Sequence, residues 1–196
     1  RYELLDKIGN WGSDTGQLFF EDVRVPVANT IGDIGRGFQQ QMMQFQDERL
    51  IGSISSISSS FALWEETRRW AEERVLFGKP LAKMQVTQFK FVEMLTQLTA
   101  ARELCHACIR QADTGADATE LITMAKIFCG RTSRMVADTC IQLYGGYGYS
   151  REYPVERMMR DAKITQIYEG TNEIQRLVIA REMLRETRAF LLSGVA

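Results

Sequence analysis

Long apolar runs, histidine and net charge are all scarce in this 196-residue chain, and each shortage excludes a class of function. No apolar run approaches the roughly 20 residues that cross a bilayer, so we expect no membrane span. The net charge of −1 gives no strong field for nucleic acid or an anionic membrane surface. His106 is the single histidine, so a four-ligand zinc site would need distant partners, and we predict no metal site.

Cysteine is also sparse, and a chain of this length buries a core without a disulfide framework. The four cysteines are Cys105, Cys108, Cys129 and Cys140. They suit reduced thiols in a cytosolic or mitochondrial-matrix protein. Residues 105–108 read CHAC and mimic a metal or redox motif, but they fall inside an amphipathic helical pattern without a second cysteine pair at ligand spacing. The chain begins with Arg1 instead of Met, so we expect a processed chain or a fragment.

Helical periodicity dominates from Phe38 onward. The first helical segment is expected to end near Arg74. Its apolar residues recur at steps of three and four, at Leu50, Ile51, Ile54, Ile57, Phe61 and Trp64. The serines between residues 53 and 60 do not interrupt this spacing. We therefore predict one continuous helix, whose small serines let a neighbouring helix approach closely.

Further helices are predicted over about residues 86–112 and 118–144, in a short segment after Pro154, and from about residue 171 to 190. Residues 17–26 mix aromatic and β-branched residues and end at a proline, which is typical of one or two β-strands. Long helices with short connections favour antiparallel neighbours. We predict an all-α fold, an antiparallel four-helix bundle with a short β segment at the N-terminus.

The segment with the clearest chemical content runs from residue 142 to 181 and contains two sharp turns. The first is glycine-rich, at residues 145–148, and the second is Tyr168-Glu169-Gly170-Thr171, just before the last predicted helix. A carboxylate at a helix N-terminus, beside a glycine that permits close approach of backbone and ligand, indicates a reactive site. The alternative is a glutamate that only complements the helix dipole.

Five separated motifs resemble, in the same order, those of the acyl-CoA dehydrogenase family. They are SDT with FEDVRVP (residues 13–15 and 20–26), DERL (47–50), RVLFGKPL (74–81), QLYGGYGY (142–149) and IYEGTNEIQR (167–176). The resemblance implies that residues 1–35 are the tail of a central β-domain and that residues 36–196 are the C-terminal helical bundle domain. A complete member also has an N-terminal helical domain, so the isolated chain is expected to be inactive.

The resemblance implies α,β-dehydrogenation of an acyl-CoA thioester to a trans-2-enoyl-CoA, with FAD as the cofactor. The glutamate of IYEGT, Glu169, would remove the α-proton, and the β-hydrogen would pass as hydride to flavin N5. Some members place their base at the position of Glu48. Because this chain has both glutamates, Glu169 is the predicted base and Glu48 the alternative. Burial is expected to raise the pKa of Glu169.

The same resemblance assigns the binding residues. Thr171 and Glu173 would contact the FAD of their own active site, and Gln46, Arg49 and Gly170 would bind substrate, with Arg49 at the adenine-ribose end of CoA. The FAD of a neighbouring subunit would be contacted by Arg74, Phe77, Gln85, Gln142, Leu143, Tyr144, Gly145 and Gly146. Simple helix caps, turn glycines and surface salt bridges are the alternatives that the residues alone leave open.

Flavin contacts from two chains imply a homodimer or homotetramer. The resemblance also implies electron-transfer flavoprotein as the electron acceptor. An acyl-CoA oxidase, in which dioxygen replaces that acceptor, and a non-catalytic helical assembly module stay open as alternatives. The expected compartment is the bacterial cytoplasm or the mitochondrial matrix, and the sequence does not fix the length or branching of the acyl chain.

Overall fold

The computed structural model describes the backbone of residues 1–193 and the side chains of residues 1–185. Its helices are Gly37–Glu73 (α1), Gln85–Asp113 (α2), Thr119–Tyr144 (α3), Pro154–Ala162 (α4) and Asn172–Ser193 (α5). Short 3-10 helices are Val27–Asn29 (η1), Leu81–Lys83 (η2), Gly145–Tyr149 (η3) and Lys163–Gln166 (η4). Two antiparallel hairpins pair Tyr2–Leu4 (β1) with Gly16–Leu18 (β2), and Val75–Leu76 (β3) with Lys79–Pro80 (β4). Over the part of the chain that is described, no helix has both the length and the apolar character of a membrane span.

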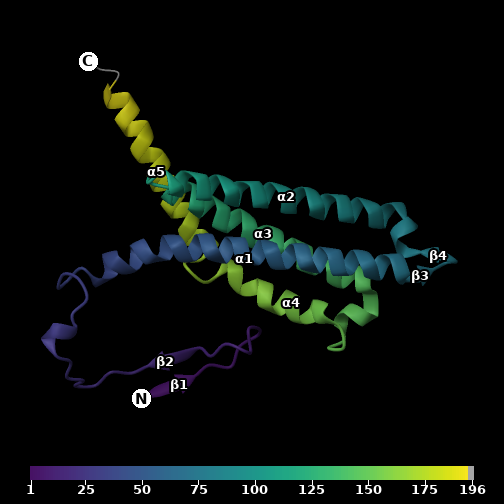
Figure 1. The fold of residues 1–196 in the computed structure, drawn as a ribbon, viewed down its shortest axis with the longest axis horizontal. Helices are drawn as coiled ribbons and strands as arrows, with labels where there is room; N and C mark the ends of the chain where they lie inside the picture. Colours follow the sequence, from purple (N-terminus) through teal and green to yellow (C-terminus); the bar gives the residue numbers. More distant parts are fainter. Residues whose placement is uncertain (194–196) are drawn as a thin grey trace.

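Three long helices, α1, α2 and α3, lie side by side and form the body of the molecule (Figure 1). Of these, α3 is central, because it packs against α1, α2, α4 and α5. The interior between the long helices is apolar, and Met94, Leu98 and Val136 are fully buried there. Each such side chain contributes roughly 1.5 to 3 kcal/mol by burial. Helix packing therefore stabilises the fold far more than the short hairpins do.

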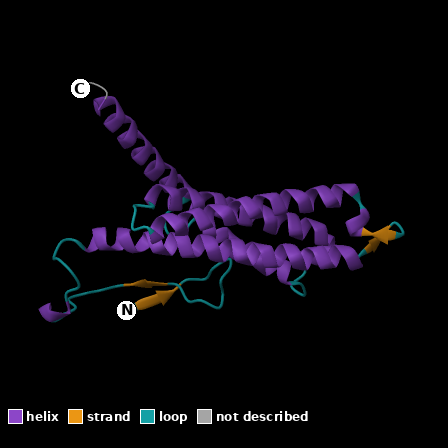
Figure 2. Cartoon of the chain, turned by 45° about the horizontal axis from the view of Figure 1, so that its top comes forward, coloured by secondary structure: helices purple, strands orange, loops and turns teal. Residues whose placement is uncertain are grey.

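The predicted all-α bundle with a short N-terminal β segment is confirmed. Its fourth long helix, α5, packs against α3, and its C-terminal part extends away from the other helices (Figures 1 and 2). On α5, Ile174, Leu177 and Leu184 have exposed fractions of 50%, 53% and 62%. Apolar exposure of this kind on one helix is typical of a surface that an assembly covers.

The serine-rich segment is helical, as predicted, because α1 continues through it without a break. The hydroxyls of Ser53 and Ser60 donate to carbonyl oxygens one turn earlier, those of Arg49 and Ser56, so these polar groups are satisfied within the helix. The buried stripe differs from the predicted apolar face, however. Ile51 is 63% exposed, whereas Ser53 and Ser60 are buried.

The predicted strand over residues 17–26 is too long, since only Gly16–Leu18 is a strand in this region. A ladder extends only as far as its partner, and β1 offers three residues for pairing. The loop between β1 and β2 is held on α4. The backbone N–H of Asn10 donates to Asp161 Oδ1 at 2.6 Å, and the Arg160 guanidinium lies 4.1 Å from the ring centroid of Trp11.

Candidate active site at the Glu169 turn

Glu169 and Gly170 form the turn between η4 and α5, and both have left-handed backbone conformations. The φ angle is 56° at Glu169 and 98° at Gly170. Glycine adopts such angles freely, whereas a glutamate does so rarely and needs surrounding contacts to stay there. Glycine is required at 170 for a second reason, because a Cβ at that position would lie 2.4 Å from Gln175 Nε2.

Side chains from three helices hold this turn by its carbonyl oxygens. Arg49 Nε on α1 donates to Glu169 O at 2.9 Å, and Lys126 Nζ on α3 donates to Gly170 O at 2.7 Å. Gln175 Nε2 on α5 donates to both carbonyls, at 3.0 and 3.3 Å. The exposed fractions of these side chains are 6%, 3% and 0%. Two of the donors are cations, and hydrogen bonds from charged donors are the stronger kind.

The turn places the Glu169 carboxylate against α1 at Gly52. A Cβ at residue 52 would come within 2.9 Å of Glu169 Oε1 and 3.1 Å of Oε2, so glycine leaves room for the carboxylate. Glu169 Oε2 is buried and accepts no hydrogen bond within the described residues. Buried polar atoms are nearly always paired, and an orphaned carboxylate oxygen is a candidate proton acceptor for a ligand.

Burial raises the pKa of Glu169 to about 7. The positive charges of Lys126 and Arg49 act in the opposite direction, and the negative charge of Glu48 raises the pKa further. Desolvation thus outweighs two nearby cations. A carboxylate with this pKa is a stronger base than an ordinary glutamate, and it still loses its proton near neutral pH.

Glu48 lies one helical turn before Gly52 on α1, so the two candidate bases belong to one site. Its Oε1 accepts a hydrogen bond from Gln44 Nε2 at 2.8 Å, and its charge acts on Glu169. The closeness of the two carboxylates therefore does not decide which of them is the base. Glu169 differs from Glu48 by its buried carboxylate oxygen, which has no hydrogen-bond partner among the described residues.

Of the predicted substrate residues, Gly170 is part of this turn and Arg49 contacts it. Its guanidinium is buried beneath the turn and bonded to the Glu169 carbonyl, and burial lowers the pKa of Arg49 from its ordinary value. The alternative of a surface salt bridge is therefore wrong. Arg49 thus holds the Glu169 turn, and its contact with the adenine-ribose end of CoA stays a prediction. Gln46 Oε1 is buried and has no hydrogen-bond partner in the described part of the chain.

The predicted contacts to a neighbouring subunit's FAD lie at the other end of the bundle. Arg74 follows α1, Phe77 is in the β3–β4 turn, Gln85 begins α2, and residues 142–146 span the end of α3 (Figure 1). At 1.5 Å per residue, α1 separates Arg49 from Arg74 by about 38 Å. One copy of the chain therefore presents two separate candidate sites.

The end of α3 has an open surface that suits a flat, polar cofactor such as FAD. The φ angle of Gly145 is 61°, and Cβ atoms at Gly145 and Gly146 would meet nothing within 4 Å. Phe77 is 95% exposed, so a stacked ligand would cover an apolar ring that now faces solvent. Leu143 and Tyr144 are buried, so their backbone groups and not their side chains are the possible cofactor contacts.

The remaining predicted cofactor residues are exposed or half-buried. Gln85 and Gln142 are exposed, and the guanidinium of Arg74 lies 5.2 Å from the ring centroid of Tyr147. At the Glu169 end, Thr171 Oγ1 accepts a hydrogen bond from the N–H of Ile174 at 3.4 Å. A backbone hydrogen bond lowers the pKa of the exposed Glu173. These are capping contacts at the start of α5, and they leave the side chains at the surface.

Sequence reasoning missed Lys126, Gln175 and Gly52. For Lys126 a signal was present, because it stands four residues after Ile122 and three before Cys129, both of which are buried. A lysine on the apolar stripe of a helix indicates a buried cation.

The cysteines of the CHAC segment are buried in the helix interior, where Cys105 Sγ lies 3.6 Å from Cys129 Sγ. Within residues 1–185 no cluster of three or more potential metal ligands occurs.

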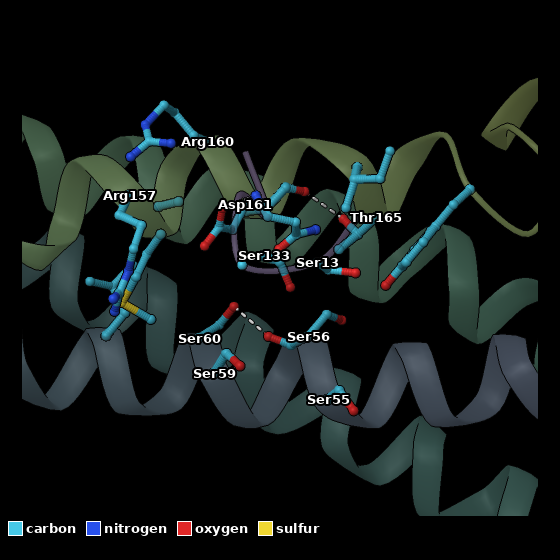
Figure 3. A pocket seen from close by; sticks show the side chains of 18 of the residues that line it. Ser13, Ser55, Ser56, Ser59, Ser60, Ser133, Arg157, Arg160, Asp161 and Thr165 are labelled. Atoms are coloured by element: carbon cyan, nitrogen blue, oxygen red, sulfur yellow. Dashed lines mark hydrogen bonds between the residues drawn. The ribbon is translucent and has the colours of Figure 1, made fainter. Parts of the chain in front are cut away.

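A cavity of about 610 Å³ lies beside the Glu169 turn and includes Tyr168 in its wall. Ser55, Ser56 and Ser59 of α1 form one wall, and α4 with the loop at Ser13 forms the opposite side (Figure 3). The expectation that the serines admit a closely packed helix therefore fails for these three residues, which face open space. Its serine wall begins about one helical turn after Gly52 on α1, the helix that also carries Glu48.

Comparison with known proteins gives concordant results. Residues 35–184 match the family described as acyl-CoA dehydrogenase, C-terminal domain. An acryloyl-CoA reductase (NADH) of Anaerotignum propionicum is 40% identical over 179 residues, which are 91% of this chain and 45% of that protein. A cyclohexane-1-carbonyl-CoA dehydrogenase of Geobacter metallireducens is 39% identical over 180 residues, or 92% of this chain and 47% of that protein.

Among solved structures, butyryl-CoA dehydrogenase from Megasphaera elsdenii superposes with a TM-score of 0.90 at 39% identity, covering 94% of this chain and 48% of that one. The chain thus spans about half the length of the relatives it matches. The family match and the shared fold agree, and the chain belongs to the acyl-CoA dehydrogenase family, of which it contains the C-terminal domain.

Proposed function

We propose that Glu169 is the general base in the α,β-dehydrogenation of an acyl-CoA thioester. The observation that carries this proposal is the buried, unpaired carboxylate oxygen of Glu169, whose pKa is raised to about 7. The α-proton of a thioester is weakly acidic, so its removal needs a base of raised strength in a site without water. Glu169 takes that proton, the C–H electrons form the new double bond, and the β-hydrogen leaves with its electron pair.

FAD, when bound, supplies the acceptor for that hydride. Thr171 and Glu173 would hold it in the site of the same copy. The cluster at the opposite end of the bundle, which includes Arg74, Phe77, Gln85 and residues 142–146, would hold the cofactor of a neighbouring copy. The separation of about 38 Å along α1 supports a shared site and hence a homodimer or homotetramer. Electron-transfer flavoprotein is the proposed final acceptor, in a bacterial cytoplasm or a mitochondrial matrix.

Glu48 remains the alternative base, and its charge acts on Glu169 either way. The distinguishing experiment uses the full-length protein that contains this chain, with Glu169→Gln and Glu48→Gln compared under anaerobic conditions. Loss of flavin absorbance after addition of acyl-CoA measures the reaction. We expect Glu169→Gln to lose about 10²- to 10⁴-fold in rate, the usual contribution of a positioned base. Near-normal turnover by Glu169→Gln with an inactive Glu48→Gln would assign the base to Glu48.

The same preparation separates the other candidate functions. Rapid reoxidation of the reduced protein by dioxygen alone would favour an acyl-CoA oxidase, whereas reoxidation that needs electron-transfer flavoprotein favours the dehydrogenase. A colourless protein that does not respond to acyl-CoA would support a helical assembly module. A series of acyl-CoA substrates from short to long, straight and branched, then defines the substrate.

A further inference from the structure

Lys126 is an unusual lysine because its ammonium group is buried at the Glu169 turn. The side chain is 3% exposed, and Nζ donates to Gly170 O at 2.7 Å and to Asn172 Oδ1 at 3.2 Å. Both acceptors are neutral, and within residues 1–185 no carboxylate lies at ion-pair distance from Lys126 Nζ. Burying an ammonium costs free energy that neutral acceptors return only in part. An apolar residue would serve the helix packing better, which points to a role for the charge itself.

The charge of Lys126 acts on the Glu169 carboxyl more strongly than any other charged neighbour does. The remaining charged groups around that carboxyl are Glu48 and Arg49 on α1, with Glu173 on α5 acting on Lys126. Tyr168, which precedes Glu169, is a neutral neighbour whose pKa is raised, chiefly by burial. Burial lowers the pKa of Lys126 to about 8, so the ammonium persists at neutral pH.

The contacts of Lys126 differ from those of the other two side chains that hold this turn. Gln175 holds the carbonyls without a charge, and Arg49 is a cation that bonds the Glu169 carbonyl. Lys126 bonds the next carbonyl, Gly170 O, and also the side chain of Asn172 at the first position of α5. It links the turn and the start of α5 to the N-terminal third of α3.

We propose that Lys126 is a positioning residue for Glu169, which fixes the Glu169–Gly170 turn and keeps the buried carboxyl of Glu169 ionised and able to accept a proton. The inference rests on the proposed function of Glu169 as the base. It assigns Lys126 no contact with substrate. The same charge that stabilises the carboxylate also limits its basic strength, so the ammonium sets the pH at which the base becomes available.

The test compares Lys126→Gln with Gln175→Met in the full-length protein. Lys126→Gln keeps a donor near Gly170 O but removes the charge, whereas Gln175→Met removes a neutral donor and leaves the charge. Lys126→Arg retains the charge and is the conservative rescue. The protonation of Glu169 is followed by difference infrared spectroscopy of substrate-free protein across pH, with the Glu169→Gln variant identifying its carboxyl band.

We expect the apparent pKa of Glu169 to rise by about one pH unit in Lys126→Gln and to stay near its original value in Gln175→Met and Lys126→Arg. At pH 7, a rise from about 7 to about 8 lowers the ionised fraction of the substrate-free protein, and hence kcat/KM, by about fivefold, with recovery at higher pH. An unchanged Glu169 titration in Lys126→Gln would overturn the inference. A shifted titration in a protein that does not process acyl-CoA would uphold it and refute the proposed function.

If Lys126→Gln does not fold, Lys126→Arg decides the question. A folded arginine variant whose Glu169 titrates as in the wild type supports the requirement for a cation. A folded arginine variant whose Glu169 titrates at higher pH, like an uncharged replacement, contradicts it. Circular dichroism and thermal unfolding of each variant establish folding before the titration.

Discussion

Gly52 and Glu169 are in contact across α1 and the turn before α5, and a methyl group at residue 52 would force the Glu169 carboxylate to move. A Cβ at residue 52 would stand 2.9 Å from Glu169 Oε1. The residues are more than a hundred positions apart in sequence, yet the absence of one side chain sets the place of the other. Glycine at residue 52 is unfavourable for the stability of α1 but leaves space for the Glu169 carboxylate.

Gly52→Ala is expected to raise stability and lower activity at the same time. Alanine in a helix interior is favoured over glycine by up to about 1 kcal/mol, so the free energy of unfolding should rise or stay level. The new methyl group displaces the Glu169 carboxylate, and kcat with acyl-CoA should fall by about tenfold or more. Chemical denaturation and turnover of the full-length protein check both parts. A variant with wild-type kcat would show that the carboxylate position is not critical.

Gly170→Ala is expected to destabilise the protein by about 2 kcal/mol or more. The φ angle of 98° is strained for alanine, and its Cβ would also collide with Gln175 Nε2. Gly115 offers a matched control, because its φ is 75° and a Cβ there meets nothing within 4 Å. Gly115→Ala should therefore show only the smaller cost of the backbone angle. Equal losses for the two variants in urea unfolding would contradict the close packing of the turn.

The Glu169 carboxyl makes the pH dependence of stability run opposite to that of an ordinary salt-bridged carboxylate. Its folded pKa of about 7 lies above the unfolded value of about 4.3, so the folded state binds the proton more tightly. The stabilising contribution is fully present below about pH 4 and is lost as pH rises through 7. Lys126, whose pKa is lowered to about 8 by burial, stays charged as Glu169 titrates and loses its own proton only at higher pH.

Glu169→Gln should consequently gain stability relative to wild type as the pH rises from 4 to 8, by roughly 1 to 3 kcal/mol. Glutamine avoids the burial of a charge and keeps the shape of the side chain. Unfolding free energies of the two full-length proteins at matched pH values measure this difference. A constant difference across the pH range would mean that Glu169 titrates at an ordinary pKa.

Phe77→Ala should weaken FAD binding without changing stability. The ring is 95% exposed, so its removal costs no core packing, and the free energy of unfolding without cofactor should change by less than about 0.5 kcal/mol. Phe91, which is buried, is the contrasting position, where alanine should cost about 3 to 5 kcal/mol. Flavin titration by fluorescence measures the affinity. Unaltered FAD affinity in Phe77→Ala would remove this residue from the proposed cofactor site.

Those parts of the fold that depend on a local sequence pattern could be predicted from the sequence. The three-and-four spacing predicted α1 to α3 closely, and Pro154 marked the start of α4. The strand prediction failed because pairing depends on a partner strand, which residues 17–26 do not reveal. The serine face could be recognised as helical, but whether its side chains meet a helix or a cavity depends on what lies opposite.

The candidate site was accessible through the Glu169 motif and the DERL motif that contains Arg49, whereas the contacts of the supporting residues with the turn were not. Arg49, Lys126 and Gln175 come from three helices that are far apart in sequence, and only their packing brings them to one turn. The place of Lys126 on an apolar stripe predicts a buried cation, but the sequence does not show that these three side chains meet at the Glu169 turn. The raised pKa of Glu169 depends on this convergence, since the burial and the opposing charges arise from separate segments.

Because α1 is one continuous helix, the number of residues between the two candidate sites fixes both their distance and their relative orientation. Adding or removing a single residue between Arg49 and Arg74 would turn one end about 100° relative to the other, since an α-helix has 3.6 residues per turn. Evolution can therefore lengthen the connection after α2 at little expense, but the interval within α1 must be inherited unchanged or altered by whole turns.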